Sequence, residues 1–284
     1  MLVIVGYIVV VGSVLGGFTM AGGSIGSLIH PSELVTIGGA ALGALITMCP
    51  MKVLMDLIKA VLAAFKGNQF GKVAYEELFK AMYELMQNAR RNGLLFLEQH
   101  VREPEQSSIF SKYPTLVHNH HAMEFIAGSL SLVIDGTVTP EQLPELMEAE
   151  LKTLEDEHHA PLDVITKTAD GLPGFGIVAA VLGIVVTMAH IDGPVEEIGH
   201  SVGAALVGTF LGILMSYGFI APLAVQMDFL GKSEFAYFRS IATILQGMAN
   251  NTHPKVVIEK ARRSMPGDAR VSQEELAEML AGVQ

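Results

Sequence analysis

Four stretches of the chain contain apolar and small polar residues with no charged side chain among them. These stretches are Met1–Ser32, Leu34–Met51, Gly171–Ile191 and Gly199–Met227. Each reaches or nearly reaches the ~20 residues with which a helix crosses a hydrocarbon core about 30 Å thick. A soluble protein would instead spread its apolar residues at helical or strand periods. The pattern predicts an all-α integral membrane protein with four transmembrane helices, near residues 2–21, 34–51, 172–191 and 200–222.

The positive charges predict how these spans are oriented. All 18 Lys and Arg residues lie between Lys52 and Lys167 or from Lys232 onward. Because positively charged loops stay in the cytoplasm, both termini and both charged segments are predicted to be cytoplasmic. The predicted parts are 1–51 with spans one and two, 52–170 as a large helical cytoplasmic domain, 171–226 with spans three and four, and 227–284 as a cytoplasmic tail.

The segment between spans two and three is predicted to be helical. Apolar residues recur every three or four positions over 78–86, and Gly93 interrupts that pattern. A second helix is predicted to start at Thr139 as N-cap, with Gln142 as its capping-box partner, and to run to about Thr168. The net charge of −11 excludes nucleic acid as a partner.

Three further helix ends carry local signals. In the tail, Ser272 and Glu275 have the spacing of a capping box. Pro173 is predicted to occupy the first turn of span three, where its missing N–H costs nothing. Pro222 removes the bond to the carbonyl of Gly218, so it is expected to bend or stop span four.

The histidine clusters "HNHH" (118–121) and "EDEHH" (155–159) raise the question of a metal site. No pair has the i, i+4 spacing of a helical zinc motif, and the single Cys49 supplies no ligand set. Solvated loop histidines are the favoured interpretation. No glycine-rich stretch ends with the Lys and Ser or Thr of a phosphate-binding loop. From these two observations together we predict no metal, no cofactor and no enzymatic activity.

The four spans, with the boundaries given above, contain no Asp or Glu. Their residues able to titrate include His190, Tyr7 and Tyr217. An ionisable group in a membrane is costly and usually functional, and a proton carrier needs an acid at mid-depth. Any coupling carboxylate must therefore come from another polypeptide, with spans three and four supplying a close-packed wall of small residues and Thr209 a hydroxyl.

Several strings resemble one family, the A subunit of the bacterial flagellar stator, MotA. They are "MLVIVGYIVVVGSVLGGFTMAGGS", "LPGFGIVAAVLGIV", "VGTFLGILMSYGFIAPLA", "ARRNGLLFLEQHV" and "IFSKYP". The resemblance implies a ring of A subunits, generally five, around two single-span B subunits in the bacterial inner membrane. The B subunit would carry the membrane Asp, and proton flow would turn the ring against the rotor's switch ring.

The resemblance also implies roles for particular residues. Arg90, Glu98 and Glu150 match rotor-interacting charges, and one helix could display the first two because eight residues place them about 80° apart. Pro173 and Pro222 match the family's two mechanistic prolines, which favours a hinge.

The coupling ion is predicted from one position in span three. Sodium-driven relatives have Thr where this chain has Ala180, and a hard cation gains from an additional oxygen ligand. Ala180 therefore favours protons, with Thr209 and Tyr217 as further candidates on the ion path.

Three alternatives remain open at this point. An ExbB/TolQ-type energiser would use proton flow for work in the periplasm or outer membrane, but resembles a three-span protein. A membrane enzyme with its site among the loop histidines is a second alternative. A scaffold subunit without transport is a third.

Overall fold

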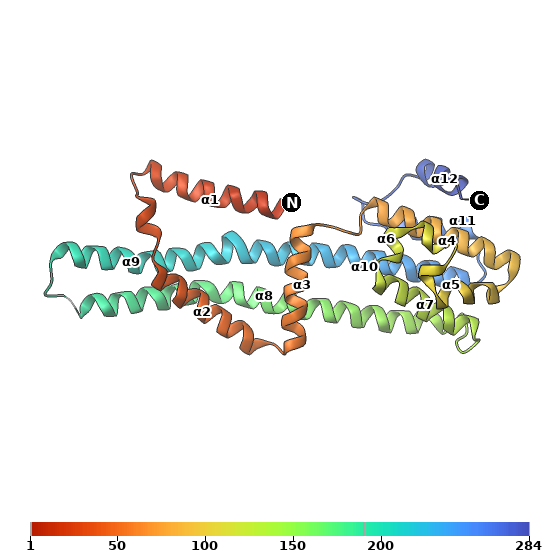
Figure 1. Ribbon diagram of the computed structural model, residues 1–284, viewed down its shortest axis with the longest axis horizontal. Coiled ribbons are helices and arrows are strands. Elements are labelled where there is room, and N and C mark those ends of the chain that lie inside the picture. The colour runs from red at the N-terminus through yellow and green to blue at the C-terminus, as the bar shows by residue number, and fades with distance from the viewer. Residues whose placement is uncertain (1, 190, 284) are drawn as a thin grey trace. The chain divides into compact units, whose positions relative to one another are not determined.

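The computed structural model describes residues 2–189 and 191–283, and every regular element in these ranges is helical (Figure 1). This confirms the predicted all-α fold class. His190, one of the span residues able to titrate, lies outside the described residues. The chain forms two compact units, each built from two stretches of sequence. The membrane unit comprises Met1–Gly67 and Glu157–Leu230, and the polar unit comprises Asn68–Asp156 and Gly231–Gln284.

The helices of the membrane unit carry the predicted spans. They are α1 (Leu2–Met20), η1 (Ile25–Leu28), α2 (Pro31–Met48), α3 (Met51–Lys66), α8 (Leu143–Met188), α9 (Val195–Ile213), the π-helical η5 (Leu214–Ile220) and α10 (Ala221–Ala249). The first part of α8 and the last part of α10 belong to the polar unit. Four helical stretches of the described residues are long and apolar enough to cross a membrane. Helices satisfy all backbone groups internally, so in lipid even the Val- and Ile-rich α1 is helical.

Helix α8 corrects one sequence-based boundary. It begins at Leu143 and runs for 46 residues to Met188, so it does not end near Thr168. At its start the N–H of Thr139 bonds to the Gln142 side chain at 3.1 Å, which is half of the predicted capping box. The N–H groups of Gln142 and Leu143 bond to the Thr139 carbonyl, so residues 140–142 form a turn before the helix.

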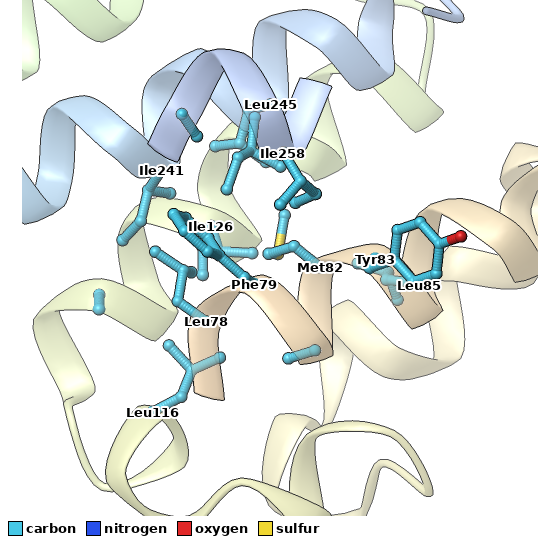
Figure 2. Packing of buried hydrophobic residues seen from close by; sticks show 14 of the residues in the cluster. Leu78, Phe79, Met82, Tyr83, Leu85, Leu116, Ile126, Ile241, Leu245 and Ile258 are labelled. Atoms are coloured by element: carbon cyan, nitrogen blue, oxygen red, sulfur yellow. The ribbon is translucent and has the colours of Figure 1, made fainter. Parts of the chain in front are cut away.

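The polar unit surrounds its own hydrophobic core. Its remaining elements are α4 (Lys72–Asn92), η2 (Leu94–Leu97), α5 (Glu98–Arg102), η3 (Pro104–Gln106), η4 (Phe110–Lys112), α6 (Pro114–Val117), α7 (His120–Ile134), α11 (Pro254–Arg263) and α12 (Gln273–Ala281). Figure 2 shows the side chains of Phe79 and Met82 on α4 lying close to those of Ile241 and Leu245 on α10 and Ile258 on α11. All five are fully buried, which explains the apolar period of α4.

Two local signals in this unit are confirmed. Helix α4 ends at Asn92, and the next residue, Gly93, has a φ of 86° that suits glycine and an N–H that bonds to the carbonyl of Ala89 at 2.8 Å. Ser272 and Glu275 form the complete capping box at the start of α12, with hydrogen bonds of 3.0 and 2.7 Å.

Candidate ion path and hinge

Helices α8 and α9 lie side by side within the membrane unit and touch through glycines (Figure 1). A Cβ atom added at Gly176 would lie 2.9 Å from the carbonyl oxygen of Gly208 and 3.1 Å from the Cα of Gly212. A Cβ atom at Gly212 would lie 2.7 Å from the carbonyl oxygen of Leu172. These neighbours are backbone atoms, which cannot rotate away. The small residues therefore allow the close backbone contact that the sequence predicts.

The contact of α8 and α9 through Gly176, Gly208 and Gly212 is called the glycine seam. Pro173 lies at the end of this seam, in the interior of α8 rather than in a first turn. The sequence-based placement is wrong because α8 already begins at Leu143. A proline has no N–H, so the carbonyl of Ala169, four residues earlier, loses its helical partner. The hydroxyl of Ser216, from η5, donates to that carbonyl at 2.6 Å, and both residues are buried. A side chain from one helix thus replaces the hydrogen bond that proline removes from another.

Pro222 follows a widened turn instead of stopping the helix. Residues Leu214–Ile220 form a π-helix, in which the N–H of Ala221 bonds to the carbonyl of Ser216 five residues earlier. Helix α10 then continues, so the expectation of a stop is wrong. π-Turns inside helices allow a backbone with missing bonds to continue and often occur at functional sites. The hydroxyl of Tyr7, on α1, donates to the carbonyl of Phe219 in this turn at 3.0 Å.

The three candidate residues of the ion path have different surroundings. The backbone N of Ala180 lies 3.3 Å from where a Cβ atom at Gly208 would be. Thr209 follows that glycine on α9, and Ala180 and Thr209 are both half-buried. The seam therefore brings their backbones into neighbouring positions. Tyr217 is 67% exposed, so its side chain is not part of the buried seam.

One acid in the membrane unit was missed by sequence reasoning. Helix α2 begins at Pro31, so Glu33 is the third residue of the helix that carries the second candidate span. It is 7% exposed. The prediction that the spans contain no acid is therefore wrong, because span two was started one residue after Glu33. The proline in first helical position was the signal for the earlier start.

The charges matched to rotor contacts lie on separate helices. Arg90 is exposed near the end of α4, whereas Glu98 begins α5, so one continuous helix does not display both. The left-handed Gly93 between them ends α4. Glu98 forms an ion pair with Arg102 at 2.5 Å. Glu150 is exposed on α8.

The short helix α5 is held by a buried hydrogen-bond network. His100 is 2% exposed, and its Nδ1 lies 2.8 Å from Oγ of Ser107. The same Oγ accepts the N–H groups of Ile109 and Phe110. Burial lowers the pKa of His100, with an opposing effect of the Glu84 carboxylate. The buried imidazole of His100 thus fixes the helix on which Glu98 stands.

A pocket of about 410 Å³ lies beside Arg90 in the polar unit. Met86 and Gly93 line it from α4, and Asn251 and Thr252 from the turn after α10. Arg90 thus faces a hollow in the surface, whereas Glu98 lines a separate cavity of about 70 Å³ with Ser131 and Asp135.

The histidine clusters lie mainly on helices, not in loops. His120 and His121 begin α7, and His158 and His159 are inside α8. Within the described ranges, no group of three or more His, Cys, Asp or Glu side chains has the arrangement of a metal site.

Known proteins match the chain over nearly its whole length. Residues 4–93 match the motility protein A N-terminal family, and residues 117–229 match the MotA/TolQ/ExbB proton channel family. Motility protein A of Salmonella typhimurium is 36% identical over 283 residues, which cover 100% of this chain and 96% of that protein. The chemotaxis protein LafT of Vibrio parahaemolyticus is 36% identical over 276 residues, which cover 97% of each chain.

Two solved structures have the same fold. The flagellar MotAB stator complex of Bacillus subtilis gives a TM-score of 0.74 at 26% identity, covering 90% of this chain and 92% of that chain. MotAB of C. jejuni gives a TM-score of 0.78 at 23% identity, covering 95% and 98%.

The fold and these matches define a helical membrane protein of the proton channel class. More narrowly, the chain belongs to the motility protein A family, because relatives of that name match it along its full length at 36% identity.

Proposed function

We propose that this chain is the A subunit of a bacterial flagellar stator. Together with a single-span B subunit that carries the membrane Asp, it couples proton flow across the inner membrane to rotation of the flagellar rotor. The full-length similarity to motility protein A carries the proposal. The Salmonella and Bacillus relatives are named for motility and for a stator complex, and this chain spans them almost completely.

The proposed assembly is a ring of A subunits, five in number, around a B dimer. Both termini and the polar unit face the cytoplasm, where the Lys and Arg residues lie. The exposed apolar surface of α1, α8 and α9 is suited to lipid and to neighbouring spans. Protons are the coupling ion, and no bound cofactor is required.

The moving element is the region where α8 meets η5. Pro173 and Pro222 each remove one backbone hydrogen bond from their helix. The hydroxyl of Ser216 and the π-turn compensate for these losses, so the helices can change shape without exposing an unpaired carbonyl to lipid. Pro173→Ala restores an N–H and an ordinary helix. We expect this variant to assemble but to stop rotation, and normal torque from it would contradict the hinge.

Arg90, Glu98 and Glu150 are proposed to contact the rotor. The variant Arg90→Glu reverses an exposed charge, and Lys255→Glu reverses another exposed charge, on α11, as its control. We expect swimming to be lost in the first variant and kept in the second. Equal motility of the two would remove Arg90 from the rotor contact.

Tethered, stator-less cells supplied with this chain and its B subunit test the function itself. At fixed proton-motive force we expect the wild-type chain to rotate the cells without sodium. In Ala180→Thr we expect rotation that is still driven by protons, at the same or a lower speed. Rotation only in sodium would keep the stator assignment and refute the argument from Ala180. A stable, proton-conducting complex without rotation would favour the energiser of the ExbB/TolQ type.

A further inference from the structure

A carboxyl group lies buried in the first turn of α2, inside the membrane unit. Glu33 is 7% exposed, and its Oε2 is fully buried without a hydrogen-bond partner among the described residues. Burial of an ionised carboxylate without a partner costs far more than burial of the neutral acid. Acids within membrane spans are rare and commonly mark ion or proton pathways. The burial of Glu33 therefore needs a functional explanation.

The carboxyl lies against the glycine seam. A Cβ atom added at Gly208 would lie 2.8 Å from Oε2 of Glu33, 3.2 Å from the Cβ of Ala179 and 3.3 Å from the N of Ala180. The missing side chain of Gly208 thus makes room for the acid where α2 meets α8 and α9. This position is next to Ala180 and Thr209, the two half-buried candidates on the ion path.

Two histidines lie at the same end of α2. His30 is the N-cap residue and acts electrostatically on Glu33. The ring centroid of His30 lies 5.9 Å from that of the exposed His200 on α9. The Nε2 atom of His30 lies 3.1 Å from the carbonyl oxygen of Ser27. The residues of α8 and α9 at this place in the seam, Ala179, Ala180 and Gly208, do not titrate. Two imidazoles thus lie near the start of the helix that carries the buried acid.

We propose that Glu33 is a proton-binding site at the entrance of the ion path. The entrance is at the end of α2 remote from Lys52, which under the proposed function is the periplasmic end. A hydronium ion at that end gives up a proton, an O–H bond forms at the carboxylate of Glu33, and a water molecule is left. The neutral acid is then the form that fits the unpartnered, buried position. Release of the same proton toward the seam restores the carboxylate for the next uptake.

Infrared difference spectroscopy of the purified complex of A and B subunits in lipid nanodiscs tests this directly. The C=O stretch of a protonated carboxylic acid is measured while the pH is raised. Glu33→Gln keeps the shape of the neutral acid, and Glu197→Gln is the matched control because Glu197 is the exposed third residue of α9. Besides the band of the B subunit's membrane Asp, we expect a second acid band that titrates in the wild type and in the control and is lost in Glu33→Gln. Identical spectra of all three would overturn the proposal.

A second variant guards against a folding effect. Glu33→Asp keeps the acid, so we expect its band to move in frequency, whereas an unmoved band would assign it to another residue. If sodium at fixed pH removes the band, the carboxylate binds a metal cation and the proton assignment is overturned.

The inference rests on the proposed function only for the side from which the proton enters and for its destination. If cells with the wild-type chain rotate but the infrared band of Glu33 is missing, the proton site at Glu33 is refuted and the stator function stands. If the band is present but the cells do not rotate, the stator function is refuted and the proton site stands.

Discussion

Insertion of one methyl group into the glycine seam tests whether backbone contact holds α8 and α9 together. In Gly212→Ala the new Cβ would lie 2.7 Å from the carbonyl oxygen of Leu172 and 2.8 Å from the Cα of Gly176. Carbon atoms attract best at about 3.5–4.0 Å, so the helices must separate by several tenths of an ångström or more. Overpacking of this kind costs about 1–3 kcal/mol. Separation would also stretch the hydrogen bond between Ser216 and Ala169.

The same helix offers the control. A Cβ atom at Gly203 of α9 would meet no atom within 4 Å, so Gly203→Ala tests the change from glycine to alanine without the contact. Alanine favours a helix by up to about 1 kcal/mol over glycine, so the control should be neutral or more stable. The predicted difference of at least about 1–3 kcal/mol corresponds to roughly a 5- to 150-fold change in the unfolding equilibrium.

Unfolding is measured by titrating the purified protein from mild detergent into SDS. The chain contains no Trp, so helicity is followed by circular dichroism and opening by maleimide reaction of the single, half-buried Cys49. If the two variants unfold within about 0.5 kcal/mol of each other, which is the usual range of harmless surface substitutions, the seam does not hold the helices together.

Three further effects follow from particular contacts. Ser216→Ala leaves the carbonyl of Ala169 unpaired, and we expect a loss of about 1–2 kcal/mol in the same SDS titration, with no loss if another donor replaces the hydroxyl. Hydrogen bonds from two neighbouring arginines of α11 hold the pKa of Glu259 at about 2, below its ordinary value of 4.5. The contribution of this contact to folding stability is therefore complete above pH 4.5 and is lost as the pH falls towards 2. In Glu259→Gln, the melting temperature should lack this part of the dependence on pH. Ser272→Ala removes a helix cap and should cost about 1 kcal/mol, seen as faster amide hydrogen exchange in α12.

The sequence predicts those features that depend on neighbouring residues. The spans follow from the absence of charge, the cap of α12 from Ser272 and Glu275, and the end of α4 from a glycine able to adopt a φ of 86°. In each case the residues that determine the conformation lie within a few positions of one another.

The features that it missed depend on residues far apart in the chain. Pro173 is tolerated inside α8 where Ser216 supplies a donor from 47 residues beyond Ala169. Glu33 is buried because Gly208 of another helix leaves space for its carboxyl. Neither the donor nor the space is visible in a local pattern.

The polar atoms of the membrane unit separate structural groups from candidate functional groups. Water cannot reach the hydrocarbon core, so a buried polar atom without a protein partner is costly there. The hydroxyl of Thr187 donates to the carbonyl of Gly183 in its own helix, and the carbonyl freed by Pro173 receives Ser216. These groups stabilise the fold and need no ligand. Oε2 of Glu33 is buried without such a bond, so a bound proton is the group that would neutralise it. The same reasoning that assigns Ser216 to structure therefore assigns Glu33 to proton binding.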